Sequence, residues 1–447
     1  MLIRSKVENF KSFSELTELV MISSSKIRRK EEHVKRLGGA KVLKFAAVYG
    51  ANAAGKSNLI GLFAFVQQVL MSGLDISHSG LYCRNNGENK KRESTFEIQF
   101  SVQEHVYAYG FTAVLSEMRI CEEWLYELSD ERVVLLLSVN ASSDEPIATD
   151  IDFSESERTR FKTYADDFSV GANTLFLNEL NRSKRYASES KFMAFVNAYR
   201  WLSENIVVIT PTRPPRDAKY LLSEEGILRV GRLLSSFDTG IAQLCPESMT
   251  LEAFADAAGS KFMEQIRADA NSRLKGSLMA KIRGCLQTSD GFYFFDISTS
   301  GISNISTLRL RHKGSAELFD FFEESDGTRR LFDLMGILLD DAEDTTYVVD
   351  ELERSLHPTL VRHFLELFME LNANGSCQIV FSSHEASIME QSLFRRDEIW
   401  FVDRGADGNS RLYSLDRFKD RFDKDIAKAY LEGRYGAVPA FDCLGEG

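Results

Sequence analysis

The sequence predicts a mixed α/β fold in three consecutive parts. Residues 96–100 alternate apolar and polar side chains, as half-buried strands do. Apolar residues take helical spacing in residues 191–201 and 251–266, and helix and strand patterns alternate from residue 328 to 401, which is typical of parallel βα units. We therefore expect a β-rich first lobe, an inserted helical region and a second α/β lobe, with bounds at 1–139, 140–290 and 291–447.

Composition favours a globular, cytoplasmic protein. Of the 447 residues, 44% are hydrophobic and 27% are charged, which is ordinary for a folded chain. The six cysteines include no CxxC pair, and neither a signal peptide nor an apolar stretch of about 20 residues is visible, so no membrane association is expected. The net charge of −12 disfavours general attraction to nucleic acids, and the basic runs at 26–36 and 182–185 are interpreted first as solvated faces.

The strongest local pattern is GANAAGKS at residues 50–57, which fits the phosphate-binding loop G-x-x-x-x-G-K-[ST]. A buried strand is predicted before it, at residues 42–49. A helix is predicted after it, with Leu59, Phe63, Val66 and Leu70 on one face. Backbone N–H groups at such a helix start bind phosphate, so Lys56 would neutralise the β and γ phosphates of ATP, and the Ser57 hydroxyl would ligate Mg²⁺. The candidate nucleotide-binding residues of this loop are Gly50, Asn52, Gly55, Lys56, Ser57 and Asn58.

Two later segments add candidate residues. Residues 324–330 (ESDGTRR) place Ser325 and Gly327 before a predicted helix whose apolar stripe contains Leu331, and on its own this is a simple serine cap. Residues 345–351 (TTYVVDE) form a short apolar strand that ends in two acids. Given the phosphate-binding loop, Asp350 would hold Mg²⁺ through water, and Glu351 would polarise the water that attacks the γ-phosphate.

Two further segments follow the acids. Residues 352–358 (LERSLHP) end in a proline that is well placed to open a helix. Residues 378–384 (QIVFSSH) form a predicted buried strand that ends in His384. A lone histidine is usually structural, but the order and spacing of these motifs favour a functional role for His384.

Together with residues 7–13 (VENFKSF) and 430–437 (YLEGRYGA), these motifs resemble prokaryotic ABC-type ATPases of the overcoming-lysogenization-defect (OLD), RecF and SMC-like group. The chain is most similar to stand-alone, AAA-type ATPases of anti-phage defence systems, which lack a TOPRIM domain; too few residues follow His384 for such a domain. The resemblance implies an ABC-type P-loop NTPase head. Gln99 and Gln103 are the candidates for that family's Q-loop glutamine.

The resemblance also implies roles and partners. Ser325 and Gly327 would form a signature motif that binds the γ-phosphate held by the opposite protomer, residues 352–358 would lie at the protomer interface, and His384 would be the switch histidine. The catalytic set would then be Lys56, Glu351 and His384, and the metal set Ser57 and Asp350. Expected partners are ATP, Mg²⁺, a second copy in a homodimer or higher oligomer, and a separately encoded effector nuclease or TOPRIM protein.

The function that we expect is an ATP-binding and slowly hydrolysing molecular switch in phage defence. Two alternatives stay open. One is a RecF-like DNA-repair ATPase that binds DNA in an ATP-dependent way, against which the acidic composition weighs. The other is a scaffold stabilised by ATP with negligible turnover, against which the intact Glu351 argues.

Overall fold

The computed structural model describes residues 1–37, 39–129, 132–211, 219–259, 263, 281–288, 291–298, 301–339, 344–419 and 425–438. The chain divides into two compact units, each built from separate stretches of sequence. The first unit comprises residues 1–211, 342–352 and 372–447, and the second comprises residues 212–341 and 353–371.

An antiparallel sheet of seven strands forms one layer of the first unit. Its order is β10-β9-β8-β7-β6-β1-β2. The alternation predicted for residues 96–100 is confirmed, because every second residue of β6 is buried there. The strands are β1 (Leu2–Glu8), β2 (Thr17–Val20), β6 (Ser94–Val102), β7 (His105–Val114), β8 (Arg119–Leu128), β9 (Val133–Asn140) and β10 (Ile147–Ala148).

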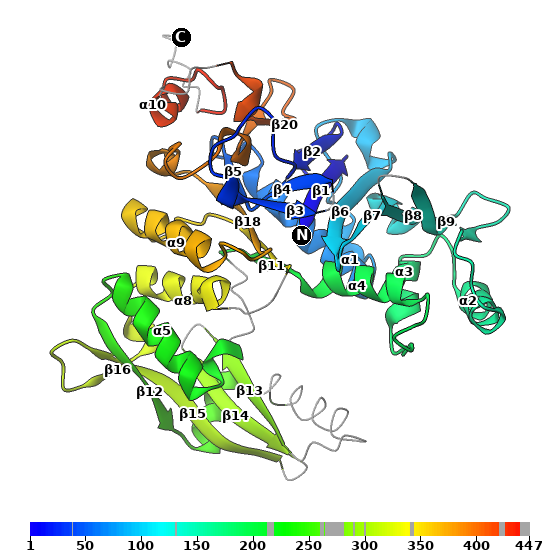
Figure 1. The fold of residues 1–447 in the computed structure, drawn as a ribbon. Helices are drawn as coiled ribbons and strands as arrows, with labels where there is room; N and C mark the ends of the chain where they lie inside the picture. Colours follow the sequence, from blue (N-terminus) through cyan, green and yellow to red (C-terminus); the bar gives the residue numbers. More distant parts are fainter. Residues whose placement is uncertain are drawn as a thin grey trace. The chain divides into compact units, whose positions relative to one another are not determined.

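A second sheet of six strands carries the phosphate-binding loop (Figure 1). Its order is β11-β17-β18-β5-β19-β20, and all neighbours are parallel except the last pair. Strand β5 is buried at all five positions, as expected of a central parallel strand covered on both faces. The strands are β5 (Phe45–Tyr49), β11 (Ile206–Ile209), β17 (Thr346–Val349), β18 (Gln378–Ser383), β19 (Ile399–Arg404) and β20 (Ser410–Ser414).

Helix α1 (Lys56–Ser72) packs against β11, β17 and β18 of this sheet and against α4. The predicted apolar face is confirmed, since Leu59, Phe63, Val66 and Leu70 are all buried. The other helices of this unit are α2 (Glu155–Asp167), α3 (Phe176–Asn181), α4 (Met193–Glu204) and α10 (Ile426–Leu431), and a two-stranded hairpin joins β3 (Val34–Leu37) to β4 (Ala40–Leu43).

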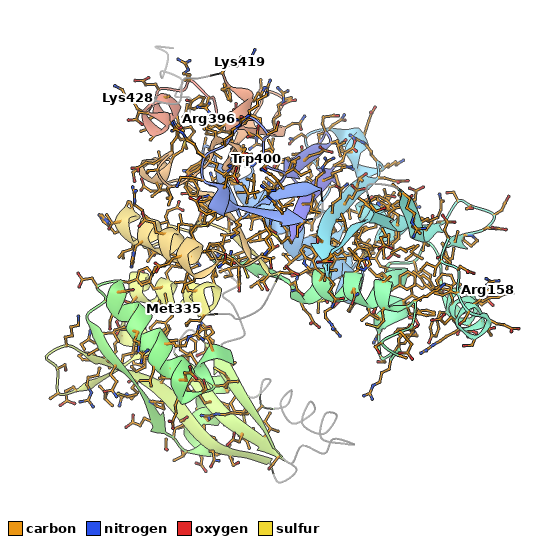
Figure 2. All side chains as sticks on the ribbon, in the orientation of Figure 1. Arg158, Met335, Arg396, Trp400, Lys419 and Lys428 are labelled. Carbon is orange, nitrogen blue, oxygen red and sulfur yellow. The ribbon has the colours of Figure 1, made fainter. Side chains whose placement is uncertain are left out.

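The second unit combines an antiparallel sheet with helices. The sheet runs β12-β15-β14-β13, and β16 pairs with β15. Met335, labelled in Figure 2, is buried in this unit. Trp400, labelled in the same figure, is buried in the first unit. The strands are β12 (Ile241–Ser248), β13 (Lys281–Gln287), β14 (Phe292–Ser298), β15 (Gly301–His312) and β16 (Leu318–Asp320); the helices are α5 (Glu224–Ser236), α6 (Leu251–Ala258), α8 (Asp326–Leu339) and α9 (Pro358–Leu371).

Two sequence expectations need correction. The single strand expected over 42–49 is two strands, because the chain turns at the buried Lys44, whose Nζ donates to the carbonyls of Asn372 (2.7 Å) and Ala373 (2.8 Å). Residues 140–290 are not purely helical, since they contain β11, β12 and β13. These strands were missed because pairing with distant strands, rather than local spacing, makes them strands.

The unit boundaries also differ from the expected 1–139, 140–290 and 291–447. The parallel sheet takes β5 from the predicted first part, β11 from the second and β17 to β20 from the third, so no cut along the chain separates the lobes. Helix α6 covers the start of the stretch predicted as helical at 251–266. The remainder of that stretch, apart from Gly259 and Met263, lies outside the described residues.

None of the helices that the structure describes is long and apolar enough to cross a membrane. The five described cysteines are free thiols, which agrees with the absence of a disulfide framework in the sequence; Cys443 lies outside the described residues.

Candidate functional site

The phosphate-binding loop joins β5 to α1 and depends on two glycines. A side chain at Gly50 would place its Cβ 2.3 Å from the carbonyl oxygen of Val402, so only glycine fits beside β19. Gly55 caps α1 with a φ of 117°, which L side chains rarely adopt, and a Cβ there would lie 2.4 Å from Oγ of Ser410. The backbone of the loop therefore lies so close to β19 and to Ser410 that side chains at these two positions would collide with them.

Lys56 is the first residue of α1, and its side chain folds back over this loop. Its Nζ donates hydrogen bonds to the carbonyl oxygens of Gly50 (2.7 Å) and Ala51 (3.0 Å) and lies 3.4 Å from Nδ1 of His384. Only 5% of Lys56 is exposed. The loop thus holds one buried ammonium group beside the histidine that ends the neighbouring strand β18.

The two acids follow β17, which pairs with β18 on the side away from β5. The hydroxyl of Ser382 lies between them, donating to Oδ1 of Asp350 (2.5 Å) and accepting from the backbone N–H of Glu351 (2.8 Å). Asp350 is 7% exposed, and Glu351 has a φ of 49°. Since β5, β18 and β17 are parallel neighbours, their carboxyl ends bring the loop, His384 and both acids to one edge of the sheet.

A cavity of about 670 Å³ opens at this edge. Its walls confirm that most of the predicted residues of the first unit come together. Those that line it are Asn52, Gly55, Lys56, Ser57, Asn58, Glu351 and His384. Gly50 and Asp350 do not line the cavity. The carbonyl oxygen of Gly50 accepts from Lys56, and Asp350 is linked to the wall residue Glu351 through the hydroxyl of Ser382.

Several residues of the cavity wall carried no predicted role in the site: Lys11, Ser12, Gly80, Tyr82, Arg84, Asn85 and Arg404. Lys11 and Ser12 belong to the VENFKSF motif, which was noted only as a family resemblance. Arg404 ends β19, the strand on the other side of β5, and the parallel-strand argument that placed His384 could have found it. The loop at 80–85 has no comparable signal.

Ser12 links the N-terminal motif to the phosphate-binding loop. Its Oγ accepts hydrogen bonds from Nδ2 of Asn58 (2.7 Å) and from Oγ of Ser410 (2.7 Å). Burial lowers the pKa of the neighbouring Lys11, although the charge of Asp350 acts in the opposite direction. The charges of Lys11 and Asp350 therefore interact, and Lys11 supplies a second cation to the cavity wall.

Ser325 and Gly327 belong to the second unit. Ser325 precedes α8, and its Oγ accepts from the backbone N–H of Thr328 (3.1 Å), which confirms a serine cap. A Cβ on Gly327 would lie 2.8 Å from the carbonyl oxygen of Ser355, so this helix start packs closely against residues 353–358. Pro358 opens α9, as predicted.

Neither glutamine considered for the Q-loop lines the cavity. Gln99 lies within β6 and donates to Glu97 (3.0 Å), and Gln103 lies in the turn to β7, where it accepts from Asn197 (3.3 Å). The side-chain amide of Gln99 thus bonds within the seven-stranded sheet, and that of Gln103 bonds to α4.

One protein family and several solved structures are similar to this chain. The family described as "AAA domain, putative AbiEii toxin, Type IV TA system" matches residues 45–390. Among solved structures, the SMC head bound to the C-winged helix domain of ScpA is similar with a TM-score of 0.41 and 13% identity, covering 92% of this chain and 97% of that chain. The SMC head domain from Thermotoga maritima gives 0.32 and 12%, covering 92% and 98%. No curated protein matches.

The family match extends over well over half of the chain and includes β5, the phosphate-binding loop, the two acids and His384. The chain therefore belongs to this family of AAA-domain proteins, and its first unit holds the family's P-loop ATP-binding site.

Proposed function

We propose that the chain is an ATP-hydrolysing switch whose site is completed by a second copy. The observation that carries this proposal is the common cavity of Lys56, Glu351 and His384, in which the Lys56 ammonium lies 3.4 Å from the imidazole. An anion that enters would accept from Lys56 in place of the carbonyl oxygens of Gly50 and Ala51. Phosphate binding therefore replaces hydrogen bonds that Lys56 makes to the loop.

Glu351 is the group placed to act on water. Glu351 lines the cavity, and its backbone N–H donates to the hydroxyl of Ser382. This bond restrains the main chain that carries the carboxylate. In the proposed reaction Glu351 orients and polarises the attacking water, His384 donates to the γ-phosphate, and Lys56 balances the charge that develops there.

Magnesium fits the side chains present. A P-loop site needs one hydroxyl, one nearby carboxylate and phosphate oxygens, rather than a cage of carboxylates. Ser57 lines the cavity, and the charge of Asp350 acts on Lys11 in the same wall. Among the described residues no group of three or more His, Cys, Asp or Glu could hold a metal unaided, so Ser57 and Asp350 would act together with the substrate. When bound, magnesium would neutralise phosphate charge.

Ser325 and Gly327 are proposed to contact the γ-phosphate bound by the partner copy. The serine-capped start of α8 presents backbone N–H groups at the positive end of a helix, which is the chemistry that phosphate requires. A nucleotide held from both sides favours the closed dimer by its differential affinity for the two states, and hydrolysis then releases it.

The decisive experiment measures molecular mass and phosphate release for wild type, Lys56→Ala and Glu351→Gln, with and without ATP and magnesium. We expect Glu351→Gln to form an ATP-dependent assembly that it cannot dissolve, Lys56→Ala to stay unassembled, and only wild type to release phosphate. The exposed Lys162→Ala and Glu155→Gln of α2 are the matched controls. Identical behaviour of all five proteins would refute the site, and assembly without turnover in wild type would favour the ATP-stabilised scaffold.

The biological role that we propose is phage defence, in which the switch restrains or loads a separately encoded effector nuclease. Support comes from the family's description, which names a toxin of type IV toxin–antitoxin systems, and from the resemblance of the motifs to stand-alone defence ATPases. Expression with its neighbouring genes in a phage-sensitive host should lower plaque counts. Lys56→Ala should abolish that protection. Protection that survives Lys56→Ala would contradict an ATP-driven role.

A further inference from the structure

A second cavity, of about 420 Å³, lies away from the ATP site in the first unit. It is formed by the loop that leads from Met21 to Lys30 and by the β3–β4 hairpin. Three exposed basic residues, Arg28, Arg36 and Lys41, line it, and the buried Arg395 is a fourth basic residue in its wall. The serines at 23–25 and the apolar Ile22, Ile27 and Val34 complete the lining named here. The wall of this cavity therefore combines cationic groups, hydroxyls and apolar atoms.

The three basic side chains are exposed, and among the residues that the structure describes none makes a hydrogen bond or ion pair with them. Neighbouring cations repel one another, so an anionic ligand bound among them would relieve that repulsion. The one acid in the cavity wall is Glu31. The hollow is thus a concentration of positive charge that a ligand could neutralise.

The charge continues past the cavity. Residues 26–41, called here the basic segment, contain seven basic residues and two acids, a net of +5 in a chain of −12. The seven are Lys26, Arg28, Arg29, Lys30, Lys35, Arg36 and Lys41. Because four of them lie outside the cavity wall, one small phosphate compound could not contact all of them. A linear polyanion could, since its charges repeat along its length.

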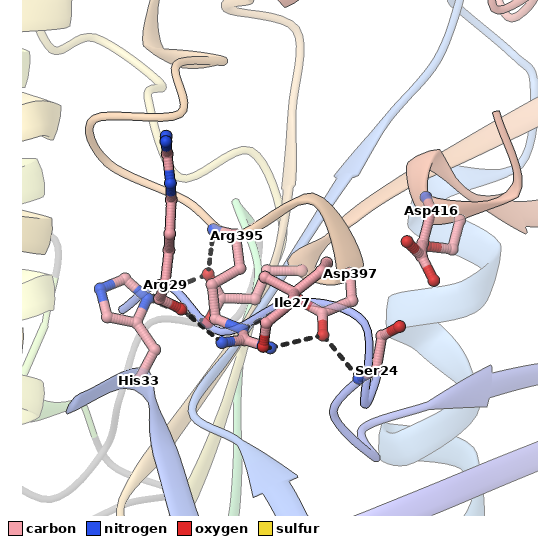
Figure 3. A network of polar contacts seen from close by, with 9 residues as sticks. Ser24, Ile27, Arg29, His33, Arg395, Asp397 and Asp416 are labelled. Atoms are coloured by element: carbon pink, nitrogen blue, oxygen red, sulfur yellow. Dashed lines mark hydrogen bonds and ion pairs between the residues drawn. The ribbon is translucent and has the colours of Figure 1, made fainter. Parts of the chain in front are cut away.

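Buried ion pairs hold the basic segment in place (Figure 3). The guanidinium of Arg395 donates to the carbonyl oxygens of Arg29 (2.6 Å) and Ile27 (3.3 Å) and forms a two-point pair with Asp397 (2.9 and 2.8 Å). Asp397 in turn accepts from the backbone N–H of Ser24 (2.7 Å). One arginine–aspartate pair therefore holds the loop at Ser24, Ile27 and Arg29.

A second buried pair fixes the start of the hairpin. Nδ1 of His33 lies 3.0 Å from both carboxylate oxygens of Glu398, and 3% of the histidine and none of the glutamate are exposed. Burying charged groups costs several kcal/mol unless their partners are well placed. These pairs preorganise a cationic surface, so a ligand need not spend binding energy on ordering it.

We propose that this cavity and the basic segment bind the phosphate backbone of a nucleic-acid strand. Arg28, Arg36 and Lys41 neutralise successive phosphates, the serine hydroxyls donate to phosphate oxygens, and Ile22, which is 40% exposed, packs against a base. Charge supplies most of the affinity, so binding is independent of sequence and falls as salt rises. The surface is separate from the ATP site and does not depend on its assignment.

The test is fluorescence anisotropy of a labelled single-stranded DNA with the full-length protein in the absence of ATP, over a range of salt concentrations. The variant is Arg28→Gln/Arg36→Gln/Lys41→Gln. Its control is Lys162→Gln/Arg185→Gln/Arg200→Gln, which removes the same charge from exposed positions elsewhere in the first unit. We expect the first triple to bind at least about tenfold more weakly and its slope of log affinity against log salt to be shallower by about 2, as the loss of three phosphate contacts predicts. The control should match wild type.

ATP binding distinguishes this proposal from the proposed function. The Arg28/Arg36/Lys41 triple should keep wild-type affinity for ATP, and Lys56→Ala should keep its affinity for DNA. Equal losses in both triples, or no DNA binding by wild type even at low salt, would overturn the proposal. So would displacement of the DNA by AMP at equal phosphate concentration, because that result would assign the cavity to a single nucleotide.

Discussion

The hydroxyl of Ser382 donates a hydrogen bond of 2.5 Å to Oδ1 of Asp350. The same hydroxyl accepts from the backbone N–H of Glu351, so one serine at the end of β18 positions both acids that follow β17. It does not line the ATP cavity. Its effect on the reaction must therefore pass through the two acids.

Ser382→Ala should slow phosphate release about tenfold while ATP affinity stays within about twofold, because a barrier rise of about 1.4 kcal/mol is expected from one lost positioning bond. Lys56 and the phosphate-binding loop are untouched. The measurement is ATP affinity and single-turnover phosphate release. Ser203→Ala, which removes a hydroxyl that donates to the carbonyl of Tyr199 (2.7 Å) in α4, is the control. A parallel loss of ATP affinity would show that Ser382 acts on binding instead.

Gly327→Ala should abolish ATP-dependent assembly and leave ATP binding by the single chain intact. Its Cβ would lie 2.8 Å from the carbonyl oxygen of Ser355, which forces the start of α8 to shift. Mass measurement with ATP, together with an ATP-binding assay, separates the two effects. Gly231→Ala in α5 is the matched control, because its Cβ would meet nothing within 4 Å, and alanine should stabilise that helix by about 0.5–1 kcal/mol. If Gly327→Ala still assembles, this helix start takes no part in the dimer.

Glu123 predicts a pH dependence of stability. Burial raises the pKa of this carboxyl from its ordinary 4.5 to about 7, against hydrogen bonds from the backbone N–H groups of Leu177 and Phe176 and from the hydroxyl of Tyr109. Between pH 4.5 and 7 the folded state therefore binds more protons than the unfolded state. The free energy of unfolding should fall as pH rises through this window, by on the order of 3 kcal/mol.

Chemical denaturation at several pH values measures this slope. Glu123→Gln should be less stable at low pH, because its amide cannot accept from both backbone groups, but its stability should lose this decline between pH 4.5 and 7. The neighbouring Glu122→Gln should keep the decline, since Glu122 is only partly buried and accepts from Nδ2 of Asn140 (2.8 Å). A wild-type curve that is flat over the window would contradict the raised pKa.

Arg395→Gln should lower the free energy of unfolding by about 3 kcal/mol, because it leaves Asp397 buried without its cation. The pair is 2% and 6% exposed at the side chains, with 2.8 Å between Nη2 and Oδ2. Arg411→Gln provides the contrast: its pair with Asp407 is 70% and 46% exposed, and its loss should leave the denaturation midpoint unchanged. Similar small effects from both variants would mean that the network in Figure 3 does not brace the basic segment.

Much of the ATP site could be predicted from local sequence. Lys56, Glu351 and His384 each stand at the end of a strand or the start of a helix that its own residues specify, and the structure brings all three to one cavity. Lys11 and Ser382 could not be found in this way. Their positions depend on which strands become neighbours, and a run of apolar residues such as FAAVY contains no information about the order of a parallel sheet.

The boundaries of the two units could not be predicted from sequence patterns either. Strand β11 has only four residues, and it is a strand because β17 pairs with it along its whole length. The buried ion pairs are a further example: Arg395 and Asp397 are two residues apart in an ordinary charged stretch, and only the fold brings the carbonyls of Ile27 and Arg29 to them.

The place of β5 in its sheet bears on how the chain is made. Both neighbours of β5, β18 and β19, come from the last quarter of the sequence, beginning at Gln378 and Ile399. At about 5–20 residues per second, a ribosome that has finished β5 needs roughly 15–65 s to reach the end of the gap before β18. During that time the five apolar residues of β5 have no strand to pair with. Nucleotide therefore cannot assist the folding of β5 until β17 and β18, which carry the two acids and His384 at their ends, have been synthesised.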